Sequence, residues 1–485
     1  MVGVNDHDRD RRRDGVSRRT FVKAAGVSGT AVGLAGCIGQ GKSANSNVVK
    51  WAADSDAADQ QKPINDALHK AGLSKDIHVE ILPGSSNTDV RQAQYQRWLS
   101  ADLAEPDMLM MDSGWALTFI ARRQVMNLSE NLPEDLTKKV NKDYFQASVQ
   151  TAKSNDDDLY AIPIFPDFPT MLYRKDLVKK AGFSPDEEDW ATNSISWKKF
   201  SKVVKKAKDQ NDLKYGYTFQ ANIYEGLSCC DFNEFMTSWG GSFFGSHDNL
   251  FGPIGKRPVT VDEKPVLDSI KMIRTFIHGS GGSGTLQGYE GGIAPTAVLS
   301  WTEDTSMAPF TNKQAVAHRN WPYAIVTNGA DDVFGKDLGV MPIPYGVKPD
   351  EAKYKGTGGP AAALGGWHMV VNPNTPKQKQ TFEVIRAMMQ PSVKLKLFQI
   401  LGWIPPEPQL LKSKQAKQVP VIGRYVNQLR VAGQNAVPRP VTAVWPQESG
   451  KIAQQVHAAY ANEASPESAM STLKSQLSQI ENYNK

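Results

Sequence analysis

Asp107-Met108-Leu109-Met110-Met111-Asp112 is an apolar run bounded by two aspartates, a pattern typical of a buried β-strand. The patterns of residues 48–53 and 78–82 predict two more strands before it, and helical spacing predicts helices over residues 57–71 and 89–104. Strands that alternate with helices are typical of a parallel α/β sheet, which binds ligands beyond the carboxyl ends of its strands.

The residues that follow these strands are therefore the first candidates for a binding site. They are Asp54 and Asp56 after the first strand, residues 85–89 after the second and residues 112–115 after the third. An aspartate such as Asp112 is costly to bury without partners, which favours a functional role. The alternative is that Asp112 or Ser113 caps the helix that follows.

The rest of the chain continues the α/β pattern. Three prolines between residues 163 and 169 interrupt a strand-like stretch, and since proline is excluded from the centre of a sheet, we expect the chain to cross between two lobes here. Residues 339–344 are a candidate second crossing, and residues 361–371 are expected to form a strand of small residues. Residues 377–485 show mainly helical patterns.

The charge balance argues against a nucleic-acid partner. The 485 residues contain 56 Lys and Arg against 51 Asp and Glu, which gives a net charge of +5. The first 36 residues hold seven basic and four acidic side chains, so they contribute +3 of this surplus. A nucleic-acid binder is expected to carry a basic stripe, and the short one at residues 198–208 fits the solvated face of a helix.

The N-terminus carries an export pattern. Ser17-Arg18-Arg19-Thr20-Phe21-Val22-Lys23 resembles the twin-arginine export signal, and the uncharged residues 24–36 that follow are too few to span a bilayer. Leu34-Ala35-Gly36-Cys37 resembles a lipoprotein cleavage box, with a chance cysteine as the alternative. We therefore expect a signal over residues 1–36 and a tether over residues 37–47, with lipid on Cys37 as the anchor at the outer face of the cytoplasmic membrane.

No sequence motif points to catalysis, a metal or a cofactor. Nucleophile-elbow, dinucleotide, phosphate-loop and zinc-protease motifs are missing, and nothing selects a carboxylate pair as the acid and base of a glycosidase. His318 and His368 lie in apolar strands, where we expect core residues. Cys229 and Cys230 are neighbours in sequence, and because a bond between them requires a strained geometry, we predict two buried free thiols.

Aromatic and charged residues recur at the predicted strand ends and turns. Aromatic faces stack on the C–H faces of a sugar, while carboxylates and guanidiniums form charge-assisted hydrogen bonds with its hydroxyls. Each aromatic residue taken alone is more often a core residue, but their recurrence favours a binding cleft. The residues are Trp115, Phe165, Trp301, Trp321, Tyr323, Trp367, Trp403 and Trp445, interleaved with Arg91, Asp112, Asp167, Arg319 and Arg439.

From residue 48 onward the chain resembles the extracellular solute-binding proteins of ABC sugar importers (family 1), and within them the archaeal trehalose/maltose-binding subgroup. The matching blocks include residues 107–115 and 164–177, Tyr224-Glu225-Gly226-Leu227 with Cys230-Asp231-Phe232, Arg319-Asn320-Trp321-Pro322-Tyr323-Ala324, Leu364-Gly365-Gly366-Trp367-His368, Leu401-Gly402-Trp403 and Asn435-Ala436-Val437-Pro438-Arg439-Pro440. The resemblance implies a type II periplasmic-binding-protein-like α/β fold. Two lobes, residues 48–160 with 343–373 and residues 161–342 with 374–485, would be joined by three crossings and close like a hinge on one sugar.

The resemblance also implies roles for residues at matching positions. Asp112 and Asp167 would accept hydrogen bonds from sugar hydroxyls, and Arg439 would donate them. The stacking walls would be Trp321, Tyr323 and Trp367, and the backbone would approach the ligand at Gly365 and Gly366, where a side chain is absent.

Three further positions follow from the same resemblance. Arg91 is a candidate donor, and the acidic contact from the first loop would come from Asp54, Asp56 or Asp59, of which we take Asp56 as the candidate. Phe165 stands where the relative has tyrosine, so the ring is kept and one hydroxyl is lost. Loss of a group that hydrogen-bonds a sugar changes affinity by about 1 kcal/mol or more, which leaves the identity of the sugar open.

These observations lead to one main hypothesis and two alternatives. The main hypothesis is a lipid-anchored, non-enzymatic and monomeric receptor without a cofactor, which hands a trehalose- or maltose-like sugar to the permease subunits of an ABC importer. The alternatives are an exported carbohydrate-active hydrolase and a binding protein for a non-sugar solute such as a peptide.

Overall fold

The computed structural model describes residues 47–85, 87–154 and 156–483. All of them lie in one compact unit, Ser46–Lys485. The expected export signal of residues 1–36, with Arg18 and Arg19, the lipidation site Cys37 and the tether as far as residue 46 lie outside the described residues. Within the described ranges, no helix is both long enough and apolar enough to cross a membrane.

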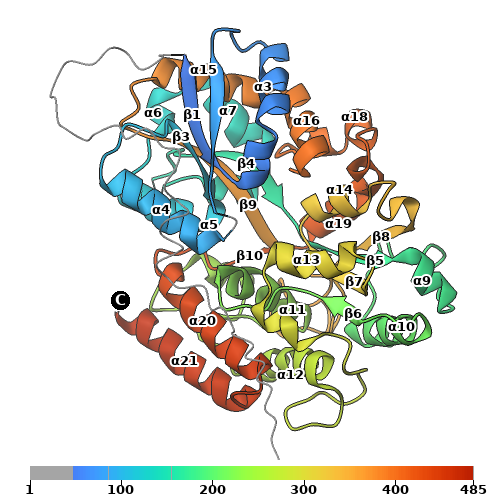
Figure 1. The fold of residues 1–485 in the computed structure, drawn as a ribbon. Coiled ribbons are helices and arrows are strands. Elements are labelled where there is room, and N and C mark those ends of the chain that lie inside the picture. Colours follow the sequence, from blue (N-terminus) through green and yellow to red (C-terminus); the bar gives the residue numbers. More distant parts are fainter. Residues whose placement is uncertain (1–46, 86, 155, 484–485) are drawn as a thin grey trace, which may run out of the picture. The chain divides into compact units, whose positions relative to one another are not determined.

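Six strands form the first sheet, in the order β10-β9-β3-β1-β2, with β4 paired to β9 (Figure 1). Its strands are β1 Val48–Ala53, β2 His78–Pro83, β3 Met108–Asp112, β4 Ile162–Asp167, β9 Ala362–Val371 and β10 Ala436–Pro438. β1 pairs in parallel with both β2 and β3, so the three strands predicted from their apolar patterns are confirmed. β9 runs antiparallel to β3 and β4, which makes the sheet mixed.

The first helical segment is shorter than its apolar pattern indicates. Asp54 directly follows β1 and caps α2, Ser55–Asp59, by accepting a hydrogen bond of 2.8 Å from a backbone N–H of its first turn. Such an acceptor satisfies one of the N–H groups that have no partner inside the helix. The helix expected over residues 57–71 is divided at Gln60 into α2 and α3, Gln61–Lys70. Asp54 is thereby held at the carboxyl end of β1, where the sheet is expected to bind ligands.

Four strands form the second sheet, in the order β6-β7-β5-β8. They are β5 Thr170–Arg174, β6 Tyr215–Thr218, β7 Ala315–Asn320 and β8 Leu338–Met341. One large apolar core joins this sheet to α10 Trp197–Gln210, α11 Phe232–Ser238 and α12 Lys264–His278. The same core includes the C-terminal helices α20 Trp445–Tyr460 and α21 Pro466–Tyr483, which lie side by side (Figure 1).

The chain passes from the first sheet to the second later than expected. β4 pairs with β9 of the first sheet, whereas β5 pairs with β7 and β8 of the second, so the crossing lies between Asp167 and Thr170 rather than after residue 160. Within the described residues β9 is the only partner of β4, and an edge strand tolerates proline because its free side needs no N–H donors. A bulge between Pro163 and Phe165 accommodates the proline-rich sequence.

A pair of C-terminal helices also packs elsewhere than expected. α15, Gln378–Met388, and α16, Pro391–Leu401, bury apolar side chains such as Ile385 and Leu397 in the same core as Trp51 of β1. This pair therefore belongs to the first sheet, although residues 374–485 were assigned to the second lobe. Helical periodicity shows that a helix has an apolar face, but it does not show which sheet the face covers.

The remaining helical segments lie between the elements described above in sequence. A π-helical turn, Leu227–Asp231, precedes α11 and carries Cys229 and Cys230. The others are α4 Thr88–Ser100, α5 Ser113–Ala121, α6 Leu128–Asn131, α7 Glu134–Asp143, α8 Gln146–Gln150, α9 Lys175–Lys180, α13 Glu303–Thr311, α14 Tyr323–Asn328, α17 Pro408–Leu411, α18 Lys414–Lys417 and α19 Val426–Gln434.

Candidate ligand-binding pocket

One pocket is lined by all eleven ligand-binding residues that are expected from the sequence. It is lined by residues that follow strands of both sheets and by the turns next to them. The expected residues in its lining are Asp56, Arg91, Asp112, Phe165, Asp167, Trp321, Tyr323, Gly365, Gly366, Trp367 and Arg439. Asp54, the alternative to Asp56, also lines the pocket, whereas Asp59 does not.

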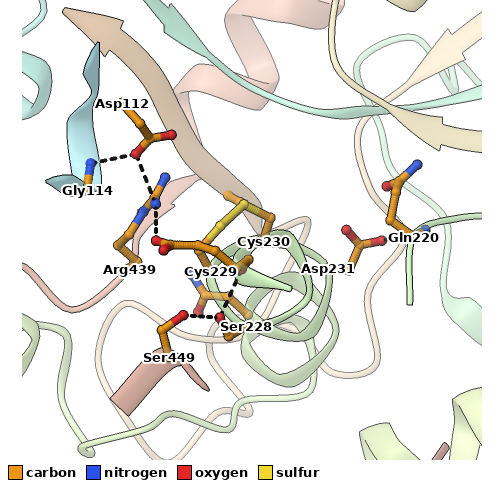
Figure 2. Close-up of a disulfide and its surroundings, with 12 residues drawn as sticks. Asp112, Gly114, Gln220, Ser228, Cys229, Cys230, Asp231, Arg439 and Ser449 are labelled. Atoms are coloured by element: carbon orange, nitrogen blue, oxygen red, sulfur yellow. Dashed lines mark hydrogen bonds and ion pairs between the residues drawn. A yellow bond between two sulfur atoms is a disulfide. The ribbon is translucent and has the colours of Figure 1, made fainter. Parts of the chain in front are cut away.

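Asp112 combines the two roles that the sequence left open. Its Oδ1 accepts a hydrogen bond of 2.7 Å from the backbone N–H of Gly114 and so caps α5. The same oxygen lies 3.1 Å from Nη1 of Arg439 (Figure 2). Capping therefore fixes the orientation of a carboxylate that faces the pocket.

Arg439 is held between two acidic side chains. Besides Asp112, its Nη1 donates a hydrogen bond of 2.6 Å to Oε1 of Glu225, which also accepts one of 2.9 Å from the indole N–H of Trp445. The two carboxylates raise the pKa of Arg439 against the opposing effect of its burial. A Cβ at Gly114 would lie 2.4 Å from Nη1 of Arg439, so the absence of a side chain there lets the guanidinium approach α5.

Arg91 and Trp367 form a stacked pair at the pocket wall. The guanidinium carbon of Arg91 lies 4.4 Å from the centre of the Trp367 ring, which packs edge-on against Trp115. Nε of Arg91 donates a hydrogen bond of 3.0 Å to the carbonyl oxygen of Ser85. Its buried Nη1 has no hydrogen-bond partner in the described part of the chain. A buried donor without a partner is costly, so Arg91 is suited to bind an oxygen of a ligand.

A second aromatic stack lies in the pocket wall at β4, where Phe165 is the register partner of Trp367. The rings of Phe165 and Trp403 lie parallel with centres 4.7 Å apart, and both side chains line the pocket. Trp403 in turn contacts Trp51 of β1 edge-on. The aromatic ring at position 165, which has no hydroxyl, is thus fixed by its neighbours.

The ring of Trp321 lies between the buried guanidinium of Arg319 and the backbone at Gly365. The guanidinium carbon of Arg319 is 4.8 Å from the centre of the Trp321 ring. On the side of β9, a Cβ at Gly365 would lie 2.9 Å from ring atoms of Trp321, so only glycine allows this contact. The indole remains partly exposed and lines the pocket, which leaves ring surface available for a ligand.

Two other glycines in the lining have a specific reason to be glycine. Gly402 ends α16 in the left-handed conformation, with φ of +71°, and a Cβ there would lie 2.8 Å from the backbone of Tyr323. Gly366 has φ of +141°, and its Cβ would meet the carbonyl oxygen of Phe165 at 2.8 Å. Side chains other than hydrogen are strained at such angles, so both positions bring backbone to the pocket.

Arg319 is itself the centre of a buried ion cluster. Its Nε and Nη2 donate hydrogen bonds of 2.8 and 2.6 Å to the two carboxylate oxygens of Glu234. Its Nη1 lies 3.2 Å from Oδ2 of Asp231 and donates a hydrogen bond of 2.9 Å to Gln220. Burial raises the pKa of both Asp231 and Glu234, and the positive charge of Arg319 opposes that rise.

Carboxyl groups dominate the charge of the pocket. Its lining contains seven carboxyl side chains and two guanidiniums. Burial raises the pKa of Asp56 to about 6, and the nearby carboxylates of Asp54 and Asp304 add to the rise. Burial also raises the pKa of Asp54, and that of Asp167 well above its usual range. Tyr323 donates a hydrogen bond of 3.0 Å to Asp304 and so joins this acidic side of the pocket.

The bonding state of the two adjacent cysteines differs from the one predicted from the sequence. The structure joins Cys229 and Cys230 by a disulfide, so the expectation of free thiols was wrong, whereas their burial was predicted correctly (Figure 2). The reasoning assumed a regular helix or strand, in which neighbouring side chains diverge. The pair lies instead in the π-helical turn Leu227–Asp231, and both residues line the pocket.

The family of the chain follows from a comparison with protein-family models. The model described as "Bacterial extracellular solute-binding protein" matches residues 67–422. The chain belongs to this family. It is therefore a solute-binding component of a transporter, and the expectation that it is not an enzyme is confirmed.

Individual relatives of this solute-binding protein agree with that assignment. A "Probable ABC transporter-binding protein" of Deinococcus radiodurans is 28% identical over 408 residues, which cover 83% of this chain and 86% of the relative. Among solved structures, maltose-bound MalE3 of T. maritima superposes with a TM-score of 0.73 at 24% identity over 89% of this chain and 98% of that one. A solute-binding protein of Thermotoga lettingae bound with α-D-tagatose gives a TM-score of 0.70 at 19% identity, over 90% of this chain and 100% of that one. These likenesses confirm the periplasmic-binding-protein-like α/β fold.

Several residues that line the pocket of this solute-binding protein were not among its expected ligand contacts, although Thr88 and Trp403 lie in segments or sets named as candidates. They are Ser55, Thr88, Glu225, Gly226, Cys229, Cys230, Thr302, Glu303, Asp304, Leu401, Gly402 and Trp403. Glu225 and Trp403 lie in blocks that carried the family resemblance, so a signal for them existed. Glu303 and Asp304 begin α13 shortly after Trp301, but they lie outside every block of the family resemblance, so they were not selected.

The pocket presents groups that can bind a polar ligand with apolar faces. In the described residues, no group of three or more His, Cys, Asp and Glu side chains is placed to hold a metal ion. His318 and His368 are buried strand residues that hydrogen-bond to Thr218 and Thr151, as expected of core histidines. What the solute-binding protein offers a ligand is aromatic surface, carboxylate acceptors and two guanidiniums.

Proposed function

We propose that this solute-binding protein captures a sugar outside the cell and delivers it to the permease subunits of an ABC importer. The observation that carries the proposal is the convergence of partly exposed Trp321 and Trp367 with the carboxylates of Asp112 and Asp167 in one pocket. A pyranose ring presents C–H faces to aromatic rings and hydroxyls to charged acceptors, so it satisfies both kinds of surface at once.

Within this proposal the side chains have separate tasks. Asp112, Asp167 and Asp56 accept hydrogen bonds from sugar hydroxyls, and Arg91 and Arg439 donate to sugar oxygens. The rings that stack on the sugar are Trp321, Tyr323, Trp367 and Phe165, and the backbone at Gly365 and Gly366 approaches it closely. The free Nη1 of Arg91 supports its task most directly, because a ligand oxygen would supply the missing partner.

We propose a trehalose- or maltose-like disaccharide or a related sugar as the ligand. The block resemblance to the trehalose/maltose-binding subgroup and the fold likeness to maltose-bound MalE3 support a disaccharide. The second solved relative carries α-D-tagatose, a monosaccharide, so a panel must include both sizes. Binding would favour a conformation in which both lobes, each built around one sheet, contact the sugar.

The proposed site of action is the outer face of the cytoplasmic membrane. Arg18 and Arg19 would direct export, and lipid on Cys37 would anchor the protein through a tether rich in Gly, Ser and Asn. The protein would act there as a monomer beside its permease. The matching family is described as extracellular, which supports this location.

A thermal-shift screen tests the sugar proposal. We expect trehalose, maltose or a related sugar to raise the melting temperature of the purified protein by several degrees, because a ligand that binds only the folded state stabilises it by mass action. Tagatose, polyols and short peptides complete the panel. A shift with peptides and with no sugar would refute the proposal, and so would the appearance of product sugar during incubation.

The affinity for the sugar is expected to fall below about pH 6. Burial raises the pKa of Asp56 to about 6, and a protonated carboxyl loses the charge that makes it a strong acceptor. The ionised form of Asp56 is the one that binds the sugar. The affinity for the sugar is therefore highest above the pKa of Asp56 and falls as the pH drops through this value. Calorimetric titration should show a Kd several-fold higher at pH 5 than at pH 7.5.

Two variants test whether Asp56, rather than another acidic residue near it, causes the pH dependence of the affinity. Asp54 and Asp304 lie near Asp56, and the charge of Arg91 acts in the opposite direction. Asp56→Asn should flatten the pH dependence between pH 5 and 7.5. Asp59→Asn changes an exposed carboxylate of the same helix that lies outside the pocket. Because the charge of Asp59 adds to the raised pKa of Asp56, this variant should keep the pH dependence and shift its midpoint slightly toward lower pH. An unchanged pH profile in Asp56→Asn would assign the dependence to another group.

A further inference from the structure

The disulfide between Cys229 and Cys230 is an unusual element of the pocket wall. Both residues line the pocket, and both side chains are otherwise buried, with relative exposures of 4% and 3%. Figure 2 shows the bond next to the ion pair of Asp112 and Arg439. The small exposed area of the two residues therefore belongs to the pocket rather than to the outer surface.

The turn that carries the disulfide is anchored at both ends. Before it, Glu225 accepts hydrogen bonds from Arg439 and Trp445. At its last residue, Oδ1 of Asp231 accepts one of 3.2 Å from the backbone N–H of Gln220. Within it, the hydroxyl of Ser228 lies 2.6 Å from that of Ser449 on α20. Several contacts thus anchor the turn, of which the one to Ser449 lies outside the pocket. π-Helical turns of this kind are frequent at functional sites.

The two sulfurs differ chemically from the rest of this wall. Glu225 contributes a carboxylate and Gly226 contributes backbone, whereas a disulfide has no hydrogen to donate and presents polarizable, largely apolar surface. Dispersion contacts with such atoms favour the C–H groups of a ligand over its hydroxyls. The wall thus contains an apolar patch beside a strong hydrogen-bonding group.

We propose that the Cys229–Cys230 disulfide is a sugar-contacting surface of the pocket, and that full sugar affinity requires the bonded form. The inference rests on the proposed sugar function and adds to it the part of the pocket that accepts a C–H face. Exported proteins retain disulfides because their surroundings are oxidising, and the family of this chain is extracellular.

Breaking the bond is expected to change the shape of the wall. Bonded sulfurs are about 2.0 Å apart, whereas non-bonded heavy atoms settle at about 3.5–4.0 Å. The interior behind the turn is close-packed and resists the extra volume. The separated thiols are therefore expected to move into the space that a ligand would occupy.

Reduction by dithiothreitol tests the proposal without a mutation. Each disulfide takes two electrons and two protons from the reagent, which closes to its own cyclic disulfide. We expect the Kd for the sugar found in the thermal-shift screen to rise at least about tenfold on reduction, a change of about 1.4 kcal/mol. Saturating sugar should also slow the reduction itself, measured by trapping the thiols and quantifying the peptide that contains both cysteines.

Two variants control for an indirect effect. Cys229→Ala/Cys230→Ala removes both sulfurs and should weaken binding without any reductant. Ser449→Ala removes the hydrogen bond to Ser228 outside the pocket, and should lower the melting temperature while leaving the Kd unchanged. Equal weakening by Ser449→Ala would show that the turn, not the sulfur surface, determines affinity, and would refute the proposal.

The outcomes separate this inference from the function on which it rests. Absence of sugar binding in the oxidised wild-type protein would refute the sugar function itself. The other outcome is that the Kd for the sugar is the same before and after reduction and that saturating sugar does not slow the reduction. This outcome would leave the sugar function intact and refute the role of the disulfide.

Discussion

Arg319→Met is expected to lower the free energy of unfolding by about 3–5 kcal/mol, because it leaves two buried carboxylates without their cation. Arg319 is fully buried and binds both oxygens of Glu234 and one of Asp231. Methionine retains most of the volume, so the loss reports charge pairing rather than a cavity. Chemical denaturation at pH 7 measures it.

The pH dependence of this variant has a defined sign. Without Arg319, the pKa values of Asp231 and Glu234 rise further above their unfolded values, because burial already raises them. Groups with a raised folded pKa stabilise most at low pH and lose that contribution as the pH rises. The deficit of Arg319→Met should therefore be smaller in mild acid than at pH 7.

Arg386→Met is the matched control. Arg386 also binds both oxygens of a carboxylate, that of Asp135, at 2.6 and 3.2 Å, but this pair is exposed. Exposed pairs contribute about 0–1 kcal/mol. Similar losses in the two variants would contradict the view that the buried cluster holds the core beneath the pocket.

Trp321→Ala is expected to weaken sugar binding at least about 100-fold, in line with the 2–4 kcal/mol that buried aromatic anchors contribute to binding. The ring is fixed between Arg319 and Gly365 and is already oriented before a ligand arrives. Calorimetric titration with the sugar from the thermal-shift screen measures the change. Asp112→Ala is a less direct test, because it also removes the cap of α5.

Trp301→Ala controls for the general effect of removing a tryptophan. Trp301 is also partly buried and packs against the same core, but it lies outside the pocket and contacts Tyr215 edge-on. We expect it to lose stability and keep the wild-type Kd. Retained affinity in Trp321→Ala would remove this ring from the proposed site.

Local patterns were sufficient for three of the six strands that form the first sheet. β1, β2 and β3 were recognised because their apolar runs are short and bounded by polar residues. The same reasoning placed Asp112 at the pocket, since parallel strands end at one edge of a sheet. The late return of β9 beside β3 is a non-local pairing that no local pattern contains.

The remaining differences have a similar physical origin. α15 and α16 present apolar faces that fit either sheet, and only tertiary packing selects the first. The disulfide depends on a π-helical turn, which sequence periodicity does not reveal. The family resemblance selected the eleven expected pocket residues, nine of which lie in its matching blocks, whereas Asp56 and Arg91 lie outside them. Residue chemistry alone selects less sharply, because aromatic and acidic residues are common in cores and on surfaces.

The surplus of carboxyl groups over guanidiniums in the pocket also disfavours the binding of negatively charged solutes. Arg439 is already paired with Asp112 and Glu225, which leaves Arg91 as the other cation of the lining. A solute that carries phosphate would bring negative charge beside Asp54, Asp56 and Asp304, where like charges repel in a partly desolvated space. We therefore expect the charge of the cavity to disfavour a phosphorylated solute relative to its uncharged form, before any single hydroxyl is recognised.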